Sequence, residues 1–145
     1  MASRSSRGAG LSYDPGVLTL IEHVMTALYP RTDELPGIAD TEPREFLERY
    51  RRESTFLIWL GVIGGTLAFV FSPILTVYWP LPSFLLPEET LDRHAHRVTT
   101  TRIYLLRQAV FLVKMAAGLC WAQHPSVRER FAMAPYPQDP GTWRS

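Results

Sequence analysis

The chain has 145 residues, 46% of them hydrophobic, and its 15 basic and 14 acidic residues leave a formal net charge of +1. This length suits one domain with a hydrophobic core of its own. The balanced charge, with no basic stripe between aromatic residues, argues against nucleic-acid binding. The single cysteine, Cys120, excludes an internal disulfide and any metal site built on two thiolates.

Residues 1–12 are predicted to be a disordered leader. They contain neither the apolar stretch of a secretion signal nor the paired arginines of a twin-arginine signal, so we expect a cytoplasmic protein. A helical domain is expected from residue 13 to residue 124. Its first helix should begin near Pro15, follow a stripe of apolar residues at three- and four-residue spacing, and stop at Pro30.

A loop is predicted from Arg31 to Pro43, because Pro36-Gly37 and Pro43 punctuate that stretch. The charged segment from Arg44 to Glu53 then repeats with a period near 3.6 residues, which is typical of a helix.

The most informative feature is the segment from Ser54 to Pro87, which contains no charged residue. A straight helix from Phe56 to Trp79 would extend about 36 Å, enough to cross a hydrocarbon core of about 30 Å. However, three glycines lower its helix propensity, and Pro73 should kink or end it. A broken, re-entrant or surface-lying element therefore fits better than a clean crossing.

Three interpretations of this segment remain open: a core helix, a membrane anchor, or a surface that faces a partner protein. We favour the partner surface, because so small a chain does not need this much continuous apolar area for its own core. Exposed apolar patches of that kind mark interaction sites.

A last long helix is expected from Pro87 to His124, with Glu88 and Glu89 in its first turn, where the helix dipole favours acids. Between Ile103 and Trp121 its only charges are Arg107 and Lys114, seven residues apart and on roughly the same side. Residues 125–145 are rich in proline and should form an extended tail. The predicted fold is all-α, with three to four helices including one long apolar helix or a broken helical hairpin, and extended N- and C-terminal segments.

Candidate catalytic and metal-binding residues are few. His94 and His96 are two positions apart and would lie about 200° apart on a helix, so they cannot chelate one ion together, and we expect solvated or interfacial side chains. Cys120 has no neighbour that would activate it and should be an ordinary buried thiol. We find no catalytic triad pattern, phosphate loop or nucleotide fingerprint, and assign no catalytic, cofactor or metal residues.

The residues that we expect to contact a partner or a membrane are large apolar or aromatic side chains and two cations on the last long helix. The aromatic residues of the tail could act as rigid anchors. The set is Phe56, Trp59, Phe69, Trp79, Phe84, Arg107, Lys114, Tyr136 and Trp143.

Several motifs follow one another in an order that suggests a family. They are Ala27-Leu28-Tyr29-Pro30, Leu35-Pro36-Gly37, the apolar helix from Arg107 to Trp121, Gln123-His124-Pro125-Ser126-Val127-Arg128, and Ala134-Pro135-Tyr136-Pro137. Over most of residues 13–137 this order resembles the small subunit of gluconate 2-dehydrogenase and related two-component dehydrogenases. It is more specifically similar to the N-terminal segment that precedes the flavin domain in long-chain alcohol oxidases, where a His-Arg element resembles His96-Arg97.

The resemblance implies a non-catalytic accessory subunit of a flavoprotein of the glucose–methanol–choline oxidoreductase (GMC) family. The FAD and the catalytic histidine would belong to the large subunit, and this chain would stabilise it and help to channel a hydrophobic alcohol. The complex would lie in the cytoplasm or at the inner face of the membrane. The alternatives are a single-span or monotopic membrane anchor, with Arg51 and Arg52 on the cytoplasmic side, and a stand-alone enzyme or ligand carrier.

Overall fold

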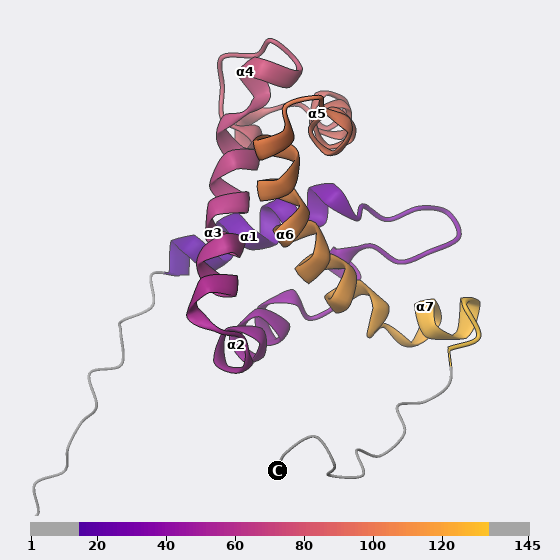
Figure 1. Ribbon diagram of the computed structural model, residues 1–145. Helices are drawn as coiled ribbons and strands as arrows, with labels where there is room; N and C mark the ends of the chain where they lie inside the picture. The colour runs from indigo at the N-terminus through magenta and orange to yellow at the C-terminus, as the bar shows by residue number, and fades with distance from the viewer. Residues whose placement is uncertain (1–14, 134–145) are drawn as a thin grey trace, which may run out of the picture.

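The computed structural model describes residues 15–133, and over that range the chain is helical and contains no strand (Figure 1). The all-α prediction is confirmed, but the expected three to four helices are too few. The seven α-helices of the described range are α1 (Pro15–Leu28), α2 (Pro43–Glu53), α3 (Phe56–Phe71), α4 (Pro73–Thr76), α5 (Glu88–Thr100), α6 (Tyr104–Ala122) and α7 (Pro125–Arg130). Two 3₁₀ turns are present, η1 (Ile38–Asp40) and η2 (Ser83–Leu85).

Two predicted helices are each broken into shorter ones. The apolar helix ends at Phe71, because Pro73 has no N–H for the helical ladder and instead starts α4. The chain then turns at Tyr78, which has a positive φ of 57°. The last long helix is interrupted after Thr100, where the hydroxyls of Thr99 and Thr100 donate back to the carbonyl of His96 at 2.9 Å. Consecutive β-branched threonines with such bonds weaken a helix.

The C-terminal prediction also needs a correction. Residues 125–130 form α7 rather than an extended tail, because Pro125 occupies the first helical position and His124 caps the helix. The Nδ1 atom of His124 accepts a hydrogen bond from the Ser126 amide at 3.2 Å. The predicted leader and the tail beyond Met133, including Tyr136 and Trp143, lie outside the described residues.

The architecture is built on the antiparallel pair α3 and α6, which pack closely against each other. Figure 1 shows α1 crossing behind this pair about half-way along it, α2 at one end of α3, and α4 and α5 at the other end. The core fills the space between α1 and the pair. Its fully buried side chains include Ile21, Val24, Met25, Val62, Phe69, Val110 and Val113.

Glycines of α3 bring the two helix backbones together. A Cβ atom on Gly65 would lie 2.1 Å from the carbonyl oxygen of Ala109, and one on Gly61 would lie 2.6 Å from Cδ1 of Leu112. Gly61 and Gly65 are four residues apart and share one side of α3, the small-residue spacing that allows close helix packing. In the sequence these glycines were interpreted as weak helix formers, although their spacing is also a visible signal for a helix contact.

Gly65→Ala should destabilise the fold, because its new methyl group would collide with backbone atoms of α6 that cannot move independently. We expect a loss of about 1–3 kcal/mol in the free energy of unfolding. Gly64 is the matched control, since a Cβ atom there would meet nothing within 4 Å. Gly64→Ala should raise the stability by up to about 1 kcal/mol. Thermal unfolding of both variants, followed by circular dichroism in mild detergent, measures the difference, and equal effects would contradict the close contact.

Candidate interaction surface

One side of α3 carries a row of apolar side chains that are exposed to solvent. Their spacing of four, seven and four residues returns to the same side of an α-helix. The first of them, Phe56, is 76% exposed. The row consists of Phe56, Leu60, Leu67 and Phe71.

A second row follows one side of α6. Its residues are seven, four and four positions apart and therefore also share one side of their helix. The opposite side of α6 is buried through Val110, Val113 and Ala117. The exposed row consists of Tyr104, Phe111, Met115 and Leu119.

The two rows lie on the same side of the molecule. Both helices turn their buried sides toward α1 and toward each other, and the exposed rows occupy what remains, the side away from α1. That is the side from which Figure 1 shows the pair. We call these eight residues, the rows of α3 and α6 together, the two-helix face.

The end of the α3–α6 pair carries a further group of exposed apolar residues. They come from α4, from the turn after it and from η2, and Tyr78 among them is 82% exposed. We call this group the apolar tip. It consists of Ile74, Leu75, Tyr78, Trp79, Leu81, Phe84 and Leu85.

Hydrogen bonds from polar side chains hold the base of the apolar tip. His94 is fully buried, its Nε2 atom donates to the carbonyl oxygen of Phe69 at 2.9 Å, and its Nδ1 atom accepts from the Thr76 hydroxyl at 2.5 Å. Arg97 donates to the carbonyl oxygen of Thr76 at 2.8 Å. These bonds pair backbone carbonyls that the end of α3 and the short α4 leave free. On the other side, Nε2 of His23 and the hydroxyl of Ser83 are 3.0 Å apart.

The solvated or interfacial role expected for His94 is therefore wrong, whereas His96 is exposed. The side chain of His94 is buried because it bridges α3 and α4, a role that depends on tertiary contacts. Among residues 15–133 no group of three or more metal-ligating side chains is gathered.

Some of the described residues of the predicted contact set are exposed or partly buried, and the others lie in the core. Phe56, Trp79 and Phe84 are exposed, with Trp79 at 41%, and Arg107 is exposed beside the ring of Tyr104, 5.9 Å from its centroid. Lys114 is partly buried.

Trp59 and Phe69 do not belong to the exposed surface. Their side chains are 8% and 0% exposed and pack in the core. Because α3 is apolar nearly all round, its residue pattern does not indicate which side is buried. The predicted contact set also lacks Leu60, Leu67 and Phe71 of α3 and four residues of α6, Tyr104, Phe111, Met115 and Leu119. The spacing of the α6 row was the signal that could have found them.

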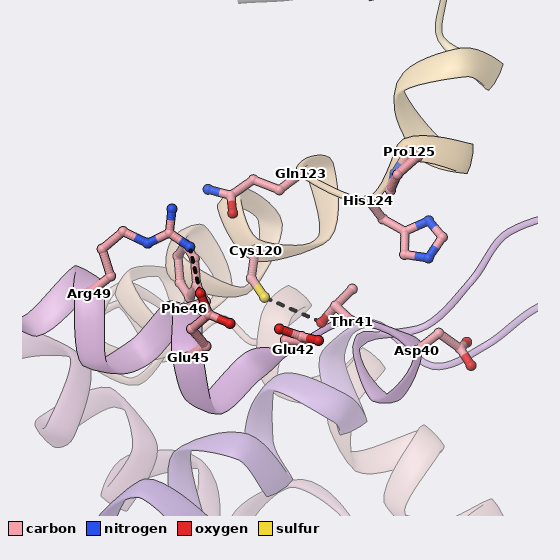
Figure 2. Close-up of a pocket in the computed structure, with 10 residues that line it drawn as sticks. All are labelled: Asp40, Thr41, Glu42, Glu45, Phe46, Arg49, Cys120, Gln123, His124 and Pro125. Atoms are coloured by element: carbon pink, nitrogen blue, oxygen red, sulfur yellow. Dashed lines mark hydrogen bonds and ion pairs between the residues drawn. The ribbon is translucent and has the colours of Figure 1, made fainter.

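A separate hollow of about 260 Å³ opens beside Cys120 (Figure 2). Burial raises the pKa of the Cys120 thiol, which lies 3.4 Å from the Thr41 hydroxyl. Figure 2 shows the ring of His124 pointing away from the sulfur. A thiol held in its neutral form, without a base directed at it, is not an activated nucleophile.

Three carboxyl groups line the same hollow, those of Asp40, Glu42 and Glu45. A hydrogen bond with Glu45 raises the pKa of Glu42, and Glu45 also lies 3.9 Å from Arg49 at the surface. These exposed contacts are typical of solvated side chains. The hollow is therefore a weaker candidate than the apolar surfaces.

By length and composition α6 could cross a membrane, and 28% of its apolar window is buried within the protein. The arrangement of the helices opposes a perpendicular crossing. α1 passes across the middle of the pair, and the loop that follows it carries Arg31, Asp33 and Glu34 at the surface. If α3 and α6 stood along the membrane normal, these charges would lie near mid-depth, where charges are costly.

No family model, curated protein or solved structure matches the chain. The resemblance to flavoprotein small subunits therefore stays a prediction.

Two histidines, the buried His94 and the partly buried His23, should make the fold less stable in acid. Burial lowers the pKa of both His94 and His23 from the ordinary value of 6.5. Below about pH 6.5 the unfolded chain thus binds more protons than the folded one, and the free energy of unfolding falls until the folded-state pKa is passed. Denaturant titrations between pH 8 and pH 5 should show this decline. His94→Gln should reduce the slope, whereas His96→Gln, an exposed control on the same helix, should retain it.

The two-helix face should make the isolated chain aggregate without detergent. Leu60→Glu combined with Phe111→Glu should lower the aggregated fraction severalfold while leaving the helical signal intact, because both side chains point to solvent. Ala39→Glu adds the same kind of charge at an exposed site away from the face and should not help. Size-exclusion chromatography with light scattering tests this. A monodisperse wild-type monomer in detergent-free buffer would contradict it.

Proposed function

We propose that this chain is a non-catalytic accessory subunit that binds a larger protein through the two-helix face. The observation that supports the proposal most directly is the alignment of two exposed apolar rows on one side of a closely packed helix pair. A rigid apolar surface of this kind is prepared for docking, because little conformational freedom is lost when a partner covers it.

Burying an apolar face of this kind would supply enough free energy for stable binding of a partner. A standard interface buries about 800 Å² on each partner. At about 25 cal/mol per Å², such an area corresponds to about 20 kcal/mol before the costs of association are subtracted. The same area exposed to water favours aggregation.

The charged residues beside the face suggest how the partner would be oriented. Arg107 and Lys114 lie at the border of the α6 row and line a hollow of about 240 Å³ together with Thr99, Gln108 and Phe111. Carboxylates of a partner could pair with these two cations at the rim. Charged pairs of this kind contribute mainly to specificity and to the rate of association.

The partner that we propose is an FAD-dependent alcohol dehydrogenase or oxidase of the GMC family. This choice is based on the resemblance in the order of helices, prolines and short motifs. The large subunit would hold the FAD and the catalytic histidine, and this chain would bind no cofactor. The apolar face would stabilise that subunit and help to lead a hydrophobic alcohol to its active site, in the cytoplasm or at the inner face of the membrane.

A tagged full-length chain isolated in mild detergent should bring with it a yellow, FAD-containing protein of several hundred residues. Leu67→Glu combined with Met115→Glu should reduce this capture at least tenfold, because both substitutions place a charge within the apolar interface. Ala39→Glu should capture as much partner as the wild type. The readouts are flavin absorbance and mass spectrometry of the eluted protein.

Two results would overturn different parts of the proposal. Capture of a protein without flavin, lost in the Leu67→Glu/Met115→Glu double variant, would keep the docking face and reject the GMC partner. Equal capture by wild type and the double variant would reject the docking face itself.

A further inference from the structure

We propose that the apolar tip inserts into a phospholipid monolayer and attaches the protein to a membrane surface. The tip is distinct from the two-helix face, so this inference does not depend on the identity of the protein partner. Figure 1 shows α4 and the turn after it projecting at the end of the molecule, beyond α5 and the start of α6. The seven exposed apolar residues of the tip lie in the charge-free segment from Ser54 to Pro87.

Apolar side chains lie on more than one side of the tip. Phe84 is on the side of α1, where its ring makes an edge contact with His23 at a centroid distance of 6.5 Å. Ile74 of the tip lines a hollow together with Phe71, which belongs to the two-helix face on the side turned away from α1. A flat protein surface would cover one of these sides, whereas lipid chains surround an inserted tip on all sides.

The backbone of the tip is suited to an environment without water. In lipid, every N–H group that lacks an acceptor is costly. Pro80 and Pro82 have no N–H group. The N–H groups of Val77 and Trp79 donate to the carbonyl of Pro73 at 2.9 and 3.4 Å.

The η2 turn closes further bonds of the same kind. The Leu85 amide donates to the carbonyl of Pro82 at 3.0 Å, and the Leu86 amide donates to that of Ser83 at 3.2 Å. In such a segment several N–H groups are paired or absent, so fewer of them lose a hydrogen bond to water when the segment enters lipid. The free-energy cost of insertion is therefore lower than for an ordinary loop.

The residues at the base of the tip limit how deep it can go. α5 packs against α4 and carries charges from its first turn onward. Arg97 donates to the Thr76 carbonyl at the base of the tip, and Arg102 is exposed just after α5. Both arginines would meet lipid phosphates once the tip is inserted. Tyr78 and Trp79 are of the type that gathers at the membrane interface. The tip would therefore enter only the outer part of one leaflet, to a depth of about 5–10 Å.

The attraction should be mainly apolar rather than electrostatic. Between Glu88 and Arg102 the three arginines are matched by three acids, Glu88, Glu89 and Asp92. Binding should therefore change little with salt or with the addition of anionic lipid, in contrast to a polybasic segment.

The test is flotation of the full-length chain with phosphatidylcholine vesicles after dilution from mild detergent. The wild type should float with the vesicles at low and high salt. Leu75→Glu combined with Leu85→Glu should lower the floated fraction at least tenfold. Both side chains are more than half exposed, so the fold should persist, and circular dichroism verifies this. The face variant Leu67→Glu/Met115→Glu is the matched control and should still float.

A second measurement locates the contact. Lipids brominated near the headgroup end of their chains should quench the tryptophan emission of the wild type. Trp79→Phe keeps an apolar ring and should float normally, but most of the quenching should disappear.

Three results would overturn the proposal. The first is normal flotation of the folded Leu75→Glu/Leu85→Glu variant, and the second is unchanged quenching in Trp79→Phe. The third is a variant pattern in which tip substitutions abolish capture of a protein partner while vesicle binding persists, because the tip would then belong to a protein interface. Failure of the flavoprotein proposal alone would instead leave every vesicle result as described.

Discussion

The rest of this structure depends on the contact between the backbones of α3 and α6 at Gly65 and Ala109. No side chain larger than hydrogen fits at Gly65, since even a methyl carbon would lie 2.1 Å from the opposing carbonyl oxygen. The contact sets the rotation of each helix about its own axis. The rotation in turn determines which residues meet α1 and which are left facing outward. Two apolar rows that are far apart in the sequence thereby become one surface.

The polar side chains of α5 that bond to α3 and α4 have a narrower task. Phe69 and Thr76 are buried near the C-terminal ends of α3 and α4, where the last carbonyls of a helix have no partner within it. His94 and Arg97 from α5 satisfy two of these carbonyls, at Phe69 and Thr76. Burial disfavours the charged form of His94 and thereby lowers its pKa. The neutral ring can therefore remain in the interior and donate to the Phe69 carbonyl. The apolar tip therefore has a defined position although most of its side chains contact solvent.

Two apolar surfaces of different shape point to two different contacts. The two-helix face is an extended side of a rigid pair and suits a protein of complementary shape. The tip is a projection with apolar side chains on more than one side and with several of its backbone N–H groups paired, which suits lipid. A protein attached at its tip would carry its partner next to the membrane, where a hydrophobic alcohol is concentrated, and this agrees with the function proposed above.

Several features followed from the sequence alone. Local rules placed α1 between Pro15 and Pro30 and α2 at the charged repeat, because proline geometry and helical periodicity act over a few residues. The charge-free segment indicated an excess of apolar surface, and part of it is exposed, including Phe56 and Trp79. Which side of α3 is buried was decided only by tertiary packing, because a helix that is apolar all round has no preferred side until a neighbour covers one. The burial of Phe69 and His94, and the alignment of the α3 and α6 rows, depend in the same way on contacts between residues distant in the chain.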